Sequence, residues 1–96
     1  MTEPHHVQHL PEDIDRELER VVRRWRELPV DRALGASGDV RALVDELAAA
    51  TAPGSAVPDL GPSVLMDQLR VLAWDAAVAG VPDLVTRLAA LRRALP

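Results

Sequence analysis

Apolar residues recur at intervals of three and four in four stretches of this chain, and prolines or glycines separate the stretches. Such spacing places apolar side chains along one face of an α-helix. No stretch shows the strict alternation of apolar and polar residues that marks a half-buried strand. The chain is therefore predicted to be all-α, a small bundle of four helices at about 11–28, 38–51, 62–79 and 82–95.

The first predicted helix has the clearest pattern. Pro11 suits a first helical position, and Pro29 ends the helix. Acidic residues fill the first turn and arginines the last, an order that complements the helix dipole. Its apolar stripe comprises Leu10, Ile14, Leu18, Val21, Val22, Trp25 and Leu28.

The middle of the chain is divided by turn-forming residues. Residues 30–36 are predicted to add at most one helical turn, and Ser37 is predicted to cap a second helix that ends near Thr51. Residues 52–62 contain three prolines and two glycines, so they are predicted to form a loop that crosses part of the surface.

The third predicted helix is apolar almost all round. A helix of this kind is usually central and covered on several sides, so we predict that position for it, with Trp74 in the core. Ser63 is predicted to cap this helix, and Gly80 to end it. The fourth helix follows Pro82, and its stripe comprises Leu84, Val85, Leu88, Leu91 and Leu95.

Composition excludes several classes of function. The 96 residues include no cysteine, which excludes disulfides, thiolate zinc sites and a cysteine nucleophile. No apolar run reaches the ~18 residues of a membrane span, and no secretory signal is evident, so a cytoplasmic location is expected. The net charge is -4. Eleven arginines and no lysine, with asparagine, phenylalanine and tyrosine also missing, are typical of a protein from a high-GC bacterium.

Residues 1–10 are predicted to be a flexible arm ahead of a single helical domain at 11–96. The arm carries His5, His6 and His9, the one concentrated group that could bind a metal. Flanking prolines oppose the helix that would align them, so a solvated tail is the preferred interpretation. No metal site, cofactor or catalytic set is predicted.

The leading functional hypothesis is a protein–protein interaction module, because a thin alanine-rich core gains from burying one more face against a partner or a second copy. Trp25 beside Arg24 has the composition of an interface hot spot. Asp67, Arg70 and Asp75 lie on an otherwise apolar helix and could face another chain. These five residues form the predicted interface.

A first alternative is a DNA-binding regulator. The segment AAVAGV, at 76–81, resembles the turn of a helix-turn-helix, and the following helix would then present Thr86, Arg87 and Arg93 to a groove. Residues 61–96 carry four arginines against three aspartates, which is not the basic patch that usually accompanies DNA binding. Nucleic acid is therefore a possible partner but not the favoured one.

A second alternative is a small helical enzyme that binds an anionic substrate through arginines. The segment IDRELERVVRRW, at 14–25, resembles the first helix of the small all-helical chorismate mutases. The resemblance implies cations that grip a dicarboxylate, although the lysine that those enzymes use is absent here. The six acids interleaved with five arginines on this helix favour a solvated, salt-bridged surface.

Overall fold

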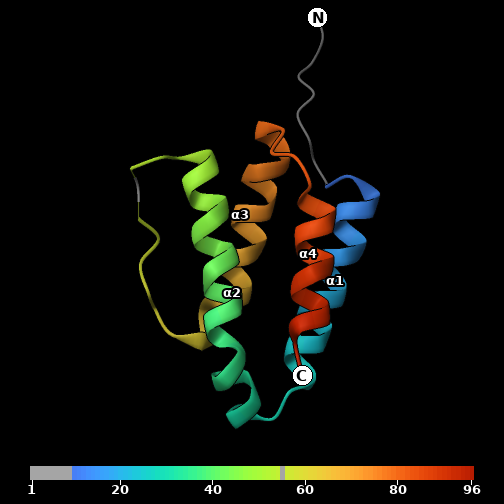
Figure 1. The fold of residues 1–96 in the computed structure, drawn as a ribbon, viewed down its shortest axis with the longest axis vertical. Helices are drawn as coiled ribbons and strands as arrows, with labels where there is room; N and C mark the ends of the chain where they lie inside the picture. Colours follow the sequence, from blue (N-terminus) through green and yellow to red (C-terminus); the bar gives the residue numbers. More distant parts are fainter. Residues whose placement is uncertain (1–9, 55) are drawn as a thin grey trace, which may run out of the picture.

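The computed structural model describes residues 10–54 and 56–96, which form four α-helices and one short 3₁₀ turn, with no strand. The elements are α1 (Glu12–Glu27), α2 (Val30–Thr51), η1 (Pro62–Val64), α3 (Leu65–Ala79) and α4 (Leu84–Ala94). The predicted all-α bundle of four helices is confirmed (Figure 1). In the described ranges no helix is long and apolar enough to cross a bilayer.

The helices associate as two parallel pairs. α2 packs mainly against α3, and α1 packs mainly against α4. In Figure 1, α1 and α4 both run downward, whereas α2 and α3 both run upward. Residues 52–54 and 56–61 lie between the upper end of α2 and the lower end of α3 (Figure 1), and they run along the surface as predicted. The topology therefore brings the C-terminal ends of α1 and α4 to the same end of the bundle.

The core is built mainly from leucine, valine and alanine. Each helix contributes one fully buried leucine, and the four are Leu18, Leu47, Leu69 and Leu88. The predicted stripes of α1, α2 and α4 supply most of the other core residues, and α3 adds Leu65, Met66, Ala73 and Ala76. Burial of these side chains stabilises the bundle in proportion to the apolar area removed from water.

α2 begins earlier than predicted. It is continuous over 22 residues from Val30, so the predicted break at residue 37 is wrong. Ser37 does not cap a helix: its hydroxyl donates to the Leu34 carbonyl oxygen at 2.7 Å, inside the helix. Ala36 and Val40 are buried, and their packing keeps the first turns helical in spite of Gly35 and Gly38.

α3 occupies the predicted position only in part. It contacts each of the other three helices, as a central helix does. One of its faces is nevertheless uncovered, since Val71 and Val78 are 57% and 60% exposed. Ser63 lies in η1, which starts with Pro62 and has no side-chain cap.

Gly80 ends α3 as predicted, in the left-handed conformation with φ of 74°. The Val81 amide donates to the Ala76 carbonyl oxygen at 2.9 Å and closes the helix end. α4 starts two residues later than predicted, after Asp83. His5, His6 and His9 lie outside the described residues, and Leu10 packs against the core.

Candidate functional site

The uncovered face of α3 is the first candidate site. Leu65, Leu69 and Ala73 point into the core, while Val71 and Val78 lie on the exposed side of the same helix. Positions 71 and 78 are seven residues apart, two helical turns, so the two valines lie along one line. The helix thus has an apolar strip that no other part of the described chain covers.

Trp74 lies between these valines rather than in the predicted core. Its side chain is partly buried, but it is not among the residues packed against the core cluster. With Val78 it lines a shallow hollow of about 250 Å³ that also includes Thr51 and Ala52 at the end of α2. A partly buried tryptophan at the edge of a hollow is the kind of side chain that anchors protein interfaces. We name Val71, Trp74 and Val78 the α3 strip.

Charged residues flank the α3 strip. Asp67 and Asp75 are exposed, and neither forms an ion pair with another described residue. Arg70 instead reaches across to α1, where its Nη1 lies 2.8 Å from Oε2 of Glu19. This hydrogen bond, helped by the positive charge of Arg70, holds the pKa of the Glu19 carboxyl below its ordinary value of 4.5. The flanks of the strip are therefore acidic.

The predicted interface is divided between two places. Asp67, Arg70 and Asp75 all lie on α3, but Arg70 and Asp75 are five residues apart and therefore lie on opposite sides of the α3 strip. Trp25 is partly buried against the core, as its place on the apolar stripe of the first predicted helix implies. Arg24 lies elsewhere, in a hollow between α1 and α4. The five residues do not form one surface.

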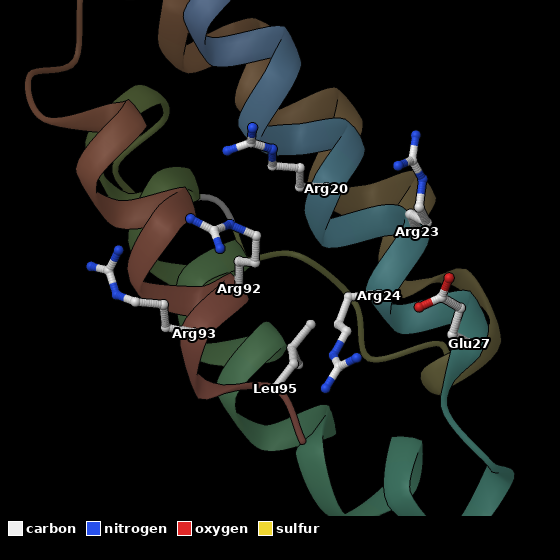
Figure 2. Close-up of a pocket in the computed structure, with 7 residues that line it drawn as sticks. All are labelled: Arg20, Arg23, Arg24, Glu27, Arg92, Arg93 and Leu95. Carbon is white, nitrogen blue, oxygen red and sulfur yellow. The ribbon is translucent and has the colours of Figure 1, made fainter.

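That hollow is the second candidate site, and we name it the arginine hollow (Figure 2). It has a volume of about 430 Å³ and lies at the end of the bundle where α1 and α4 both terminate. Five arginines line it, namely Arg20, Arg23 and Arg24 from α1 and Arg92 and Arg93 from α4. The other two lining residues are Glu27 and Leu95.

Glu17 anchors two of these arginines. Its Oε1 accepts from Nε of Arg92 at 2.8 Å, and its Oε2 accepts from Nη1 of Arg20 at 3.1 Å. The Arg92 hydrogen bond, with the charges of both arginines, holds the pKa of the Glu17 carboxyl below 4.5 although burial opposes the shift. This buried carboxylate joins α1 to α4 and fixes the orientation of both guanidinium groups.

The residues of the DNA-binding alternative do not form a basic surface. Thr86 is exposed, but Arg87 pairs with Glu46 of α2 at 3.6 Å, in a groove that also contains Asp39 and Asp45. Arg93 lies in the arginine hollow instead. α4 also runs back alongside the bundle, antiparallel to α3 (Figure 1), whereas the helices of a helix-turn-helix cross steeply.

Sequence reasoning did not identify Val71 and Val78 as exposed. A signal was present, because Asp67 and Asp75 alternate with these valines on the same side of the helix. The arginine hollow had no comparable signal, since it depends on which helix lies beside α1. In residues 10–54 and 56–96 there is no group of three or more side chains placed to bind a metal.

No known protein family matches the chain, and no curated protein or solved structure is significantly similar to it.

Proposed function

We propose that the chain is a protein–protein interaction module that binds an amphipathic helix of a partner protein along the α3 strip. The observation that supports this most directly is the exposure of Val71 and Val78 on either side of Trp74. Burial of these side chains against a partner removes apolar area from water, which is the main favourable term in protein association.

The spacing of the strip suits a helical partner. Residues 71, 74 and 78 follow intervals of three and four, the pattern that forms a seam between two packed helices. The hollow beside Trp74 offers a site for a side chain from the partner. A helix laid along α3 would therefore continue the packing that the bundle already uses.

Charge favours a basic partner over a second copy. Asp67 and Asp75 would attract lysines or arginines placed beside the apolar seam of the partner. A second copy would present the same two aspartates, and the one cation of its α3, Arg70, is already paired with Glu19. The proposed partner is thus a helix with an apolar seam and basic flanks.

Trp74 provides the reporter for a direct test. The chain has two tryptophans, so a Trp25→Phe protein leaves Trp74 as the only indole. We would titrate this protein with a synthetic helical peptide of ~20 residues that has a leucine seam and lysine flanks, a length at which isolated helices begin to form. We expect a saturable blue shift of the Trp74 emission, and a weaker response to the same peptide with glutamate flanks.

The matched controls use exposed apolar residues elsewhere. Val71→Asp with Val78→Asp should abolish binding, whereas Val30→Asp with Leu34→Asp, which alters similarly exposed residues on α2, should leave it unchanged. The proposal would be refuted if the Trp25→Phe protein did not bind the peptide with lysine flanks. It would also be refuted if both double variants lost binding to the same extent. A blue shift that depends on protein concentration alone would identify a second copy as the partner.

We also propose a cytoplasmic location in a high-GC bacterium. The location rests on the sequence pattern, which shows no apolar run of membrane-span length and no evident secretory signal, and the source rests on the use of arginine as the sole basic residue besides histidine.

A further inference from the structure

The arginine hollow has a chemistry that binding at the α3 strip does not use. It concentrates five guanidinium groups in a chain whose net charge is -4. Arginines near a helix C-terminus also interact favourably with the helix dipole. Each helix C-terminus carries only about half a negative charge, so the ends of α1 and α4 do not balance five positive charges. We propose that the arginine hollow is a binding site for a compact, multivalent oxyanion.

Three of the arginines are available to a ligand. Arg20 and Arg92 each use one N–H group to bond the Glu17 carboxylate. Arg23, Arg24 and Arg93 form no ion pair with any residue in the described ranges. Five arginines with Glu17 and Glu27 leave a net charge of +3 around the hollow.

The anchored arginines also contribute donors. Nε of Arg92 and Nη1 of Arg20 bond Glu17, which leaves the remaining N–H groups of each guanidinium unused by that carboxylate. Because Glu17 holds both groups in place, a ligand need not order them on binding. In Figure 2, Arg20 and Arg92 lie between the two helices, whereas Arg93 points outward from α4 and Arg23 points away on the other side of α1. The guanidinium groups of Arg20 and Arg92 are therefore the ones placed for bidentate contacts to phosphate or carboxylate oxygens.

The lining defines the class of ligand. Leu95 is the one apolar residue of the hollow, and no aromatic side chain lines it, so the hollow offers a ligand little apolar surface to contact. The volume of about 430 Å³ suits a small molecule. The ligand is therefore small and charged over most of its surface, as an oligophosphate or a tricarboxylate is.

Calorimetric titration of the full chain with tripolyphosphate at low ionic strength tests this inference, and citrate forms the second arm. We expect saturable binding of one anion per chain that weakens as salt is added. Stronger binding of tripolyphosphate than of citrate would identify phosphate as the chemistry, and the reverse would identify carboxylate.

Matched triple variants locate the site. Arg23→Gln, Arg24→Gln and Arg93→Gln together should weaken binding about tenfold or more, since three of the five positive charges that line the hollow are lost. Arg16→Gln, Arg26→Gln and Arg32→Gln change the net charge equally at exposed positions outside the hollow, and should change binding by less than about twofold. Circular dichroism melts would verify that both triple variants are folded.

Two outcomes would overturn the inference: no saturable binding of either anion, or equal weakening by the two triple variants. Val71→Asp with Val78→Asp should leave anion binding unchanged, so failure at the α3 strip and failure at the arginine hollow can be told apart.

Discussion

Glu17 shows how one side chain can join two helices and shape a site. Its carboxylate is buried and bonds Arg92 of α4 and Arg20 of α1 with separate oxygens. The amide in Glu17→Gln has the same shape but no charge, and it presents one donor where both arginines need an acceptor. Because both arginines remain partly exposed, we expect a loss of about 1–2 kcal/mol in the free energy of unfolding.

Urea denaturation at neutral pH measures this loss. Glu12→Gln is the control, since Glu12 lies exposed in the first turn of α1 and makes no ion pair in the described structure. An equal effect of the two substitutions would show that the bridge between α1 and α4 adds nothing to stability.

Gly80 carries a different kind of residue-level constraint. Its φ of 74° lies in the left-handed region, and a methyl group added at its Cα would meet no neighbouring atom within 4 Å. The destabilisation by Gly80→Ala therefore comes from the left-handed backbone conformation and not from a clash of the added methyl group with its neighbours. We expect about 1 kcal/mol of destabilisation, visible as a lower urea midpoint. An unchanged midpoint would mean that the turn between α3 and α4 relaxes to another conformation.

At the level of elements, α2 is helical over residues whose intrinsic helix propensity is low, because their packing outweighs that propensity. Gly35 and Gly38 lie inside the helix with no atom within 4 Å of an added methyl group, and neither has a positive φ. Gly35→Ala and Gly38→Ala should each stabilise the protein by about 0.5–1 kcal/mol, the opposite sign to Gly80→Ala. Urea midpoints give the comparison, and a loss of stability would show that residues 30–38 are not helical in solution.

Local pattern predicted the elements well where their ends are marked by proline or glycine. α1 lies within one residue of the predicted limits at each end, and Gly80 ends α3 as expected. The start of α2 could not be predicted from Gly35, Ser37 and Gly38, because burial of Ala36 and Val40 outweighs their local preference. The exposure of Val71 likewise depends on where the other helices stop covering α3.

On the scale of the whole molecule, the long connection decides which helices are neighbours. α2 and α3 can run parallel because residues 52–61 return along the bundle (Figure 1). Ten residues can span at most ~33–36 Å, and the 15-residue α3 is about 22 Å long, so the connection is long enough. The same topology places α4 beside α1, which is why residues about 70 positions apart form the arginine hollow, and no local pattern could predict it.

Arg41 tethers this connection to the bundle. Its guanidinium donates to the carbonyl oxygens of Val57 and Pro58, and Nε2 of Gln68 donates to the same Pro58 oxygen at 2.9 Å. Arg41→Ala should lower the free energy of unfolding by about 1–3 kcal/mol, because charged hydrogen bonds to the loop are lost. Faster proteolysis within residues 52–61 should accompany it. Arg32→Ala, at an exposed position of α2, is the control, and equal proteolysis of both variants would exclude the tether.

Two carboxylates make the stability of the assembled bundle depend on pH. Glu17 joins α1 to α4 and Glu19 joins α1 to α3, and their arginine partners hold the pKa of each below 4.5 in the folded protein. At a pH between the pKa of each carboxyl in the folded protein and its pKa in the unfolded chain, the unfolded chain binds more protons than the folded protein. The free energy of unfolding therefore rises with pH over this range. The two ion pairs contribute their full stability at a pH above the pKa of the carboxyls in the unfolded chain. This contribution is lost as the pH falls through the pKa values of the folded protein.

Glu17→Gln with Glu19→Gln should accordingly flatten the acid limb of the stability curve, because neither position then titrates in either state. Urea unfolding at a series of values between about pH 3 and 6 measures that slope. Glu12→Gln with Asp31→Asn removes two exposed carboxylates outside the ion pairs and should keep the wild-type slope. If the two double variants lose stability equally steeply in acid, the two bridges do not hold α1 in the bundle, and apolar packing alone keeps it there.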